Sequence, residues 1–222
     1  MNSRLLSMKS WFVTLLVPFV LLLLAVRLLL TPFFLEIEYR TPGFPLDTYG
    51  FTQADRLHWS KIAWKYLVNR SDITFLGNLR FADGNPVYNE RELAHMLDVK
   101  NLVQIVLKVW YVIIGVLFLV GIWAWRGKWL LDFRRDLRRG GWLTVCLVGV
   151  IALLAVVSFW NFFTIFHKIF FESDTWLFLY SDTLIRLFPL RFWQDTFLLV
   201  GVMTLLGGLV LGFGLKPIKK IN

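Results

Sequence analysis

The stretch LVQIVLKVWYVIIGVLFLVGIWAW, residues 102–125, decides the fold class of this chain. It is almost wholly apolar, and its one charged residue, Lys108, stands near its start. A helix of roughly 20 apolar residues crosses a hydrocarbon core about 30 Å thick. This stretch therefore predicts a transmembrane helix.

Three further runs have the length and composition of membrane spans: Trp11–Thr31, Trp142–Phe163 and Thr196–Leu215. The chain has 222 residues, of which 57% are hydrophobic and only 18% charged, and its mean hydropathy is +0.62. These values are typical of a membrane protein and exclude an ordinary soluble domain. The first run has the basic start of a signal peptide, but its apolar part is too long and no small-residue cleavage site follows, so it predicts a retained signal anchor.

Basic residues predict the orientation of the four spans. The N-terminus, the segment RGKWLLDFRRDLRRGG (residues 126–141) and the tail KPIKKIN (residues 216–222) together hold eleven Lys and Arg against two Asp. Basic loops face the cytoplasm, so both termini are predicted inside and residues 32–101 and 164–195 outside. The net charge of +9 then reflects topology and contact with anionic membrane lipids, which argues against nucleic-acid binding.

The first outer segment shows the signs of a small folded cap. LEIEYR (residues 35–40) alternates like a strand, and LRFADGNPVY (residues 79–88) has the Asp-Gly turn of a hairpin. Thr52 with Asp55 predicts a capped helix that runs to about Asn69. Asn89 with Glu92 predicts the start of another helix, which continues into the second span.

The predicted fold is thus an all-α integral membrane protein, a four-transmembrane-helix bundle with a small mixed α/β extracellular cap. Its predicted parts, in chain order, are the cytoplasmic N-terminus with the first span (1–31), the extracellular cap (32–101), the second span (102–125), the basic cytoplasmic loop (126–141), the third span (142–163), the aromatic-rich outer segment (164–195), the fourth span (196–215) and the cytoplasmic tail (216–222).

All three histidines, His58, His95 and His167, fall in the predicted outer segments. His58 lies on a polar helix face, where a structural or surface role is the simpler interpretation. His95 can share one helix side with Glu92 and Asp98. His167 follows two phenylalanines at the outer end of the third span. Two histidines at similar membrane depth, each near carboxylates and aromatics, are candidate functional residues.

The residues around these histidines offer little for a metal or a protein nucleophile. ELAH (residues 92–95) is a single Glu-x-x-His pair, whereas a di-iron helical site needs two, and the chain has no H-E-x-x-H. Cys146 lies in the cytoplasmic half of the third span. Ser158, Ser173 and Ser181 stand in no Gly-x-Ser-x-Gly elbow, although this leaves an acyl-enzyme open. The pattern fits a metal-free, cofactor-free reaction in which the substrate supplies the attacking group.

Three motifs carry a family resemblance: YNERELAHMLDV (residues 88–99), FHKIFF (166–171) and DTWLFLYSDTLIRLFPLRFWQD (174–195). They resemble successive motifs of the bacterial lipoprotein intramolecular transacylase family, as do the chain length, the four spans and the cap. The resemblance implies an acyltransferase of the cell membrane, with its site at the outer face. Its substrate would be a diacylglyceryl lipoprotein, whose sn-2 acyl chain moves to the amino group of the lipidated N-terminal cysteine. The resemblance implies that His95 and His167 are catalytic.

This chemistry suits two imidazoles. An α-amino group has a pKa of about 7.7 to 8.0 and attacks an ester only when unprotonated, so one imidazole is expected to take its proton and the other to protonate the leaving oxygen. Glu92, Asp98, Asp174 and Asp182 are candidates to orient an imidazole, and Arg186 or Arg191 to stabilise the oxyanion. Each has an alternative role as a capping or interface charge. The alternative for the whole chain is a non-enzymatic membrane scaffold or partner subunit.

Overall fold

A computed structural model of the chain describes residues 3–171 and 174–215, and of residues 3–8 it describes the backbone only. The predicted tail 216–222 and Ser173 lie outside the described residues. The helices are α1 (Ser3–Leu29), α2 (Pro32–Glu38), α3 (Gln53–Val68), α4 (Thr74–Gly77), α5 (Glu90–Arg126), α6 (Leu130–Val157), α7 (Phe159–Phe170), the 3-10 helix η1 (Asp174–Trp176), α8 (Thr183–Leu187) and α9 (Leu190–Gly214).

Four helices are long and apolar enough to cross a membrane: α5, α6 and α9 over their full lengths, and α1 from Lys9 to Leu29. This confirms four candidate spans in an integral membrane protein. The apolar run 142–163 is divided between two helices, because α6 ends at Val157 and α7 begins at Phe159. Ser158 caps α7, accepting a hydrogen bond on its Oγ from the amide of Asn161 at 3.3 Å.

The predicted strand at residues 35–40 is wrong, because this segment lies largely in helix α2. The Oγ1 of Thr31 accepts a hydrogen bond from the Phe34 amide, and Pro32 occupies the first helical position. Threonine as N-cap followed by proline is a strong helix start. Phe34, Leu35 and Glu38 then share the buried side of the helix. An isolated strand here would have no partner for its backbone groups.

The predicted hairpin at residues 79–88 is also wrong as a pair of strands. Its turn forms as expected, with Gly84 at φ 87° and hydrogen bonds from Phe81 N to Asn85 O and from Gly84 N to Phe81 O. The only pairing beyond the turn is an isolated bridge between Arg80 and Pro86. The amides of Leu79 and Asn85, which would continue the ladder, donate instead to Leu76 O and to the Asp83 carboxylate. The part of the chain that the structure describes is therefore all helix and loop, with no strand, and the mixed α/β cap is corrected.

Both predicted capping boxes are present. The Oγ1 of Thr52 accepts from the Asp55 amide, and the Asp55 carboxylate accepts from the Thr52 amide, at the start of α3. At the start of α5, the Glu92 carboxylate accepts from the Asn89 amide at 2.8 Å, and the Asn89 side chain accepts from the Glu92 amide at 3.0 Å. Helix α5 continues to Arg126 without interruption, as the sequence predicted.

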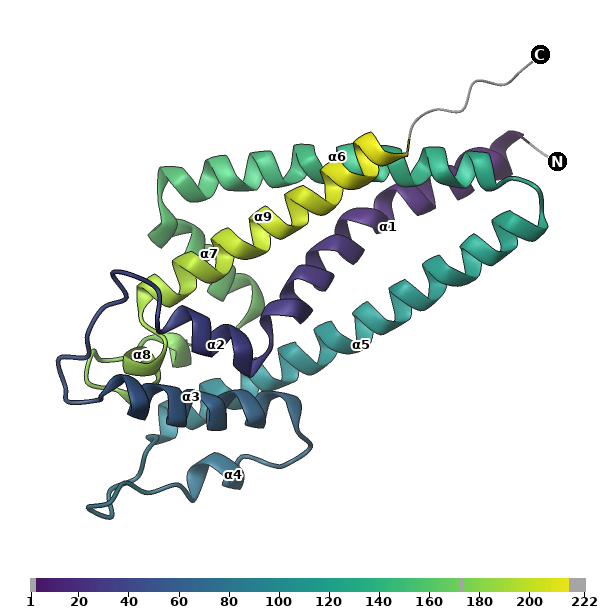
Figure 1. Ribbon diagram of the computed structural model, residues 1–222. Coiled ribbons are helices and arrows are strands. Elements are labelled where there is room, and N and C mark those ends of the chain that lie inside the picture. Colours follow the sequence, from purple (N-terminus) through teal and green to yellow (C-terminus); the bar gives the residue numbers. More distant parts are fainter. Residues whose placement is uncertain (1–2, 172–173, 216–222) are drawn as a thin grey trace. The chain divides into compact units, whose positions relative to one another are not determined.

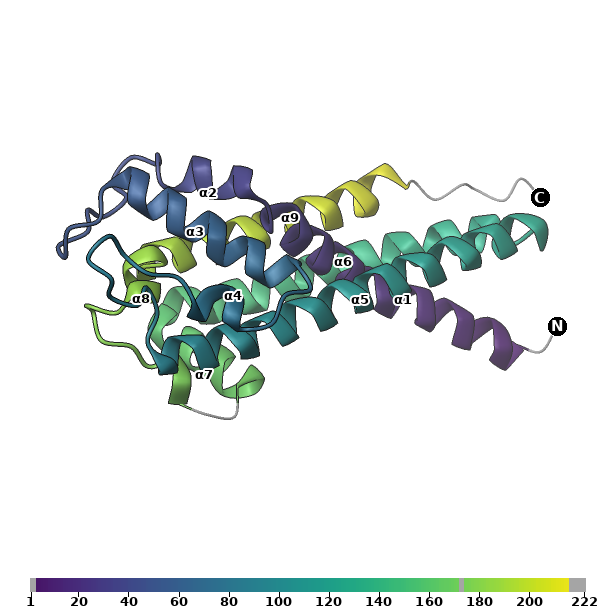
Figure 2. The same ribbon diagram turned by 90° about the horizontal axis from the view of Figure 1, so that it is seen from below.

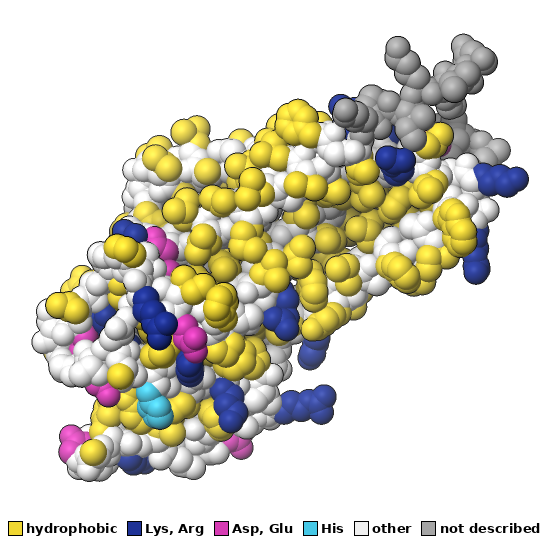
Figure 3. All heavy atoms as spheres, in the orientation of Figure 1, with side chains coloured by type: hydrophobic (Ala, Val, Ile, Leu, Met, Phe, Trp, Pro, Cys, Tyr) yellow, Lys and Arg dark blue, Asp and Glu magenta, His cyan; other side chains and the backbone are white. Residues whose placement is uncertain are grey.

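The chain divides into two compact units. The first, which we call the long-helix unit, comprises residues 1–28, 107–157 and 198–222. Its helices α1, α6 and α9 pack at glycines, where a Cβ at Gly140 would lie 2.5 Å from Val17 and one at Gly141 would lie 2.7 Å from the carbonyl oxygen of Gly208. Figure 1 shows these long helices, and Figure 3 shows hydrophobic side chains spread over them. Such an extensive apolar surface is suited to lipid.

The second unit, which we call the short-helix unit, comprises residues 29–106 and 158–197. Helix α3 packs against α2, α4 and α8, and Figure 2 shows it between α2 and α4. Its main core includes fully buried Tyr66, Leu76 and Leu187. All three histidines belong to this unit.

Candidate active site

His95 is positioned by the first turns of α5. The capping box of Asn89 and Glu92 fixes where the helix begins, and His95 follows Glu92 by one turn. The His95 side chain is buried, with 8% of its surface exposed. Its Nδ1 has no hydrogen-bond partner among the described residues. The ring is therefore held by packing and by its place on the helix.

His167 is positioned by α7. Its ring Nδ1 lies 2.8 Å from the carbonyl oxygen of Phe163, one turn earlier. A carbonyl oxygen only accepts, so this contact assigns the proton to Nδ1 and leaves the Nε2 lone pair available. His167 is 7% exposed. Burial lowers the pKa of His167, and the hydrogen bond to Phe163 opposes that shift only in part, so the ring is neutral at physiological pH.

The two imidazole rings are neighbours and nearly parallel. Their centroids are 6.2 Å apart and their planes are inclined by 23°. This distance is within the usual range for neighbouring rings, so the two side chains border one small region. Two imidazoles this close to each other suit a reaction with a proton donor and a proton acceptor.

Aromatic side chains surround the pair. Phe171 lies 5.0 Å from the His95 ring and 5.5 Å from the His167 ring, centroid to centroid. Phe178 lies 5.4 Å from His95, and Trp176 lies 4.8 Å from His167. Phe171 and Trp176 are themselves buried. Such a shell keeps water away from the imidazoles and strengthens the electrostatic interactions between them and a substrate.

Residues 177–184 bring Trp176 and Phe178 to the site by binding to the start of α5. Leu184 N donates to Glu92 at 2.6 Å, and Thr183 Oγ1 donates to the carbonyl of Val87 at 2.5 Å. The Asn89 amide group donates to Asp182 at 3.1 Å, and Arg91 donates to the carbonyl of Leu177 at the same distance. We call residues 177–184 the strap.

Two predicted supporting residues, Glu92 and Asp182, belong to this strap contact. The two Glu92 oxygens accept from the amides of Leu184 and Asn89, and one Asp182 oxygen accepts from the amide of Leu179 at 2.8 Å. Neither forms a hydrogen bond to a histidine among the described contacts. Their contacts order backbone around His95.

The other predicted supporting residues bind groups other than the histidines, or form no side-chain hydrogen bond or ion pair with a described residue. Arg186 binds the Asp47 carboxylate at 2.9 Å, and Arg191 binds Asp195 on its own helix. Asp174 is exposed, and Asp98, half-buried, makes no hydrogen bond or ion pair among the described residues. The structure therefore brings His95 and His167 together but places none of these four against them. His58 is exposed, with its ring edge-on to Trp59.

Sequence reasoning did not single out the aromatic residues of the shell. One signal in the sequence could have indicated part of the shell. The four-residue spacing of Phe163, His167 and Phe171 puts them on one face of the helix and its end, so it predicts phenylalanines beside His167. Trp176 and Phe178 follow a turn of the chain, and no local pattern predicts that they return to His167 and His95. Among the described residues, no group of three or more His, Cys, Asp or Glu could hold a metal ion.

Comparisons with known proteins show the family and the fold of the chain. Residues 11–193 match the family model of the lipoprotein intramolecular transacylase Lit. An uncharacterized protein of Aquifex aeolicus (strain VF5) is 28% identical over 204 residues, which cover 92% of this chain and 91% of that protein. The in meso structure of the membrane integral lipoprotein intramolecular transacylase Lit from Bacillus cereus has a similar fold. Its TM-score is 0.73 at 20% identity, covering 95% of this chain and 94% of the other.

Proposed function

Because the chain belongs to the lipoprotein intramolecular transacylase (Lit) family, we propose that it moves the sn-2 acyl chain of a diacylglyceryl lipoprotein to the amino group of that lipoprotein's N-terminal cysteine. The product is a lyso-form lipoprotein. The observation that carries this proposal is the pair of buried imidazoles, 6.2 Å apart, in an aromatic shell. The pair supplies proton transfer and the shell excludes water, and this acyl transfer needs both.

His167 is the proposed base. With Nδ1–H bound to Phe163, its Nε2 carries the lone pair, and its lowered pKa keeps it neutral. The α-amino group of the substrate has a pKa of about 7.7 to 8.0 and arrives largely protonated near pH 7. Loss of a proton from this nitrogen makes it a nucleophile, and loss of a second one completes the amide. A neutral imidazole beside the nitrogen accepts such a proton.

His95 is the proposed acid. When the amine attacks the ester carbonyl, the bond to the glyceryl sn-2 oxygen breaks, and that oxygen leaves only with a proton. His95 stands across from His167 and returns a proton to this oxygen after taking one from the arriving ammonium group. The nitrogen loses two protons in all: one passes through His95 to the leaving oxygen, and the other passes through His167 to bulk water. The reaction therefore releases one proton when the amine arrives protonated.

The aromatic shell protects the acyl group from hydrolysis. Water competes with the amine for the ester carbonyl, and a water molecule activated by His167 would release a free fatty acid. Phe171, Trp176 and Phe178 occupy the positions from which water would reach the two rings. Holding ester and amine in one molecule adds proximity, since the two groups need not meet by diffusion.

The test is the position of the acyl chain on a reporter lipoprotein in a host that makes only the diacyl form. Cells with the wild-type chain should yield lyso-form lipoprotein, identified by mass spectrometry. His95→Ala and His167→Ala should each lower its formation by about 10²- to 10⁴-fold with the protein still present in the membrane. His58→Ala is the matched control and should retain activity. Equal activity of all three variants would reject the histidine assignment.

We also propose the orientation of the chain, with both termini in the cytoplasm and the histidine pair at the outer face. It rests on the basic residues of the segment 126–141, which runs into the first turns of α6, and on the positive-inside rule. In a Cys146→Ala background, a cysteine at exposed Asp83 should react with a membrane-impermeant reagent in intact cells. A cysteine at exposed Arg135 should react only after the membrane is opened. The reverse pattern would place the histidines in the cytoplasm.

A further inference from the structure

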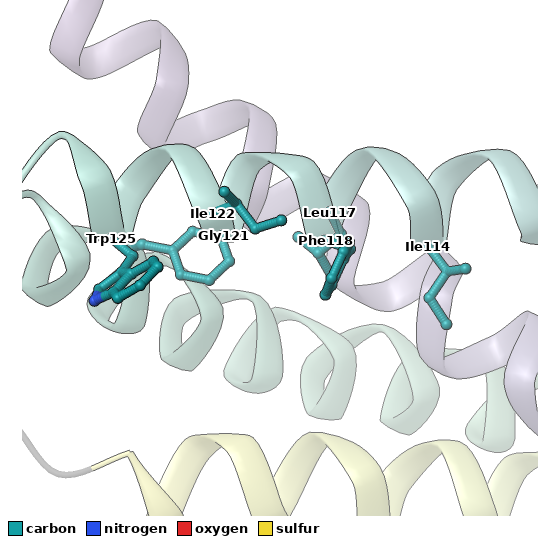
Figure 4. A pocket seen from close by; sticks show the side chains of 7 residues that line it. Ile114, Leu117, Phe118, Gly121, Ile122 and Trp125 are labelled. Carbon is teal, nitrogen blue, oxygen red and sulfur yellow. The ribbon is translucent and has the colours of Figure 1, made fainter.

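Helix α5 carries an apolar groove in the long-helix unit, separate from the histidines. Its volume is about 440 Å³. Phe133 of α6 forms one wall, and Figure 4 shows the side chains of α5 that line it. The α5 residues are Ile114, Leu117, Phe118, Gly121, Ile122 and Trp125. They recur at the three- and four-residue spacing of a single helix face, so the groove runs along the helix axis.

Gly121 gives the groove its depth. A Cβ at Gly121 would lie 3.5 Å from the ring of Phe133, at ordinary contact distance. A larger side chain at this position would therefore extend into the groove and fill it. Apart from the indole N–H of Trp125, the lining side chains carry no hydrogen-bonding group. An extended peptide segment would leave its backbone amides and carbonyls unpaired here, whereas an alkyl chain has none to pair.

The groove ends beside two cations. Trp125 is followed by Arg126 and by the turn that contains Lys128, and both basic side chains are exposed. Neither forms an ion pair with any described residue. Lys128 adopts φ 59°, a left-handed conformation that favours glycine or asparagine over lysine. A third cation is near, since the Nζ of Lys9 lies 3.9 Å from the ring centroid of Trp123.

We propose that this groove is a binding site for one anionic phospholipid. An acyl chain lies along α5 between Phe118 and Phe133, and the phosphate binds Arg126 and Lys128. Guanidinium and ammonium groups recognise phosphate through charge-assisted hydrogen bonds. A zwitterionic headgroup brings its own cation and gains less from two basic side chains. The site lies outside the proposed acyl-transfer chemistry, so it does not depend on the proposed function.

The test measures lipid retention by native mass spectrometry. The full chain in detergent is titrated with dioleoylphosphatidylglycerol and, separately, with dioleoylphosphatidylcholine, which has the same acyl chains. One saturable phosphatidylglycerol adduct is expected, with an affinity about tenfold or more above that of phosphatidylcholine. Equal affinities for the two lipids would overturn the headgroup assignment.

Two variants locate the site. Arg126→Gln with Lys128→Gln should remove the tenfold preference, and both positions are exposed, so the variant should fold. Gly121→Leu should remove the saturable adduct by filling the groove. Gly115→Leu is its matched control on the same helix, because a Cβ there has nothing within 4 Å and Gly115 does not line the groove. Equal phosphatidylglycerol binding by wild type, the charge variant and both leucine variants would overturn the proposal.

Discussion

Different kinds of contact stabilise the interior of the long-helix unit and the interior of the short-helix unit. In the long-helix unit, helices approach until a Cβ at Gly140 or Gly141 would overlap with Val17 or with the backbone of Gly208. In the short-helix unit, buried side chains bind loop and helix backbone across long stretches of sequence, as Glu92 does with Leu184. Inside a bilayer the hydrophobic effect does not drive helices together, so close packing of small residues takes its place.

Buried charge follows the same division. Among the described residues, Asp136 is the one buried charged side chain of the long-helix unit, and it accepts a hydrogen bond from Ser10 at 2.5 Å. Among the described residues of the short-helix unit, the buried charged and histidine side chains are Glu38, Asp47, Arg56, Glu92, His95, Lys100 and His167. Groups that are kept in low-polarity surroundings at a cost are often functional. The comparison thus supports the proposal that the chemistry belongs to the short-helix unit.

The largest expected effect on stability comes from a substitution that breaks the glycine contacts between helices. Gly141→Leu places a side chain where a Cβ alone would lie 2.7 Å from Gly208 O and 2.9 Å from Gly212 N, and neither backbone atom can yield. Folded protein should be lost, with a cost of about 3 kcal/mol or more in detergent unfolding. Gly149→Leu is the control on the same helix, because a Cβ there has nothing within 4 Å. Similar unfolding curves for the two variants would refute close packing at Gly141.

The second effect breaks the hydrogen bonds of the strap. In Glu92→Gln, an amide NH₂ replaces one of two oxygens that accept from the amides of Leu184 and Asn89, so one backbone donor loses its partner. The expected loss is about 1 to 3 kcal/mol of stability, measured by unfolding, together with lower lyso-form production. Glu90→Gln, at an exposed position of the same turn, should behave as wild type. An unchanged Glu92→Gln protein would mean that the strap contact is dispensable.

A smaller effect concerns pH. Burial raises the pKa of Glu38 to about 7, helped by a hydrogen bond to Asp195 and by the negative charge of that carboxylate. The folded protein then holds a proton that the unfolded chain loses near pH 4.5, so stability should fall as pH rises from about 4.5 to about 7. Melting temperatures at pH 5 and pH 8 measure this loss. Glu38→Gln should reduce the difference.

Glu36→Gln is the control for that measurement. Glu36 lies on the same helix, and its bond to Lys61 lowers its pKa, so its proton is lost below the window. The stability that Glu36 contributes is present above its ordinary pKa and fades only at lower pH. An equal change in the pH 5 to pH 8 difference for both variants would disprove the role of Glu38.

The smallest expected effect on activity comes from removing the thiol of Cys146 or the hydroxyl of Ser158. Cys146 belongs to the long-helix unit and is exposed, so Cys146→Ala should leave both stability and acyl transfer unchanged. Ser158→Ala removes the cap of α7 and should cost about 1 kcal/mol in unfolding while activity is retained. A large loss of activity in either variant, with the protein folded, would indicate a protein nucleophile.

Much of the helix pattern was predictable because its signals are local. The four apolar runs, the Thr52–Asp55 box and the Asn89–Glu92 box each depend on a few neighbouring residues, and all are found. The error at residues 35–40 came from reading alternation over six residues without its flank, although Thr31 and Pro32 marked a helix start. The hairpin failed because the amides of Leu79 and Asn85 donate to Leu76 O and to Asp83 rather than across the turn.

The site was predictable only in part. The sequence indicated His95 and His167 but not their shell, since Trp176 and Phe178 reach the rings through the strap, whose bonds join residues about ninety positions apart. Arg186 shows the converse. It appeared to be a candidate oxyanion partner, yet it binds Asp47, 139 positions away in sequence. Long-range contacts of this kind depend on how the elements pack, and composition and local spacing do not predict them.

The central claim is a direct transfer within one substrate molecule, and a crossover experiment tests it. Purified protein in detergent is given two synthetic diacylglyceryl lipopeptides together, one with a deuterated sn-2 acyl chain and the other with a different peptide and an unlabelled chain. Mass spectrometry of the lyso-form products should show the deuterated chain only on the peptide that brought it. Deuterated chain on the second peptide, or an acylated form of the protein, would contradict the account and indicate a covalent acyl-enzyme.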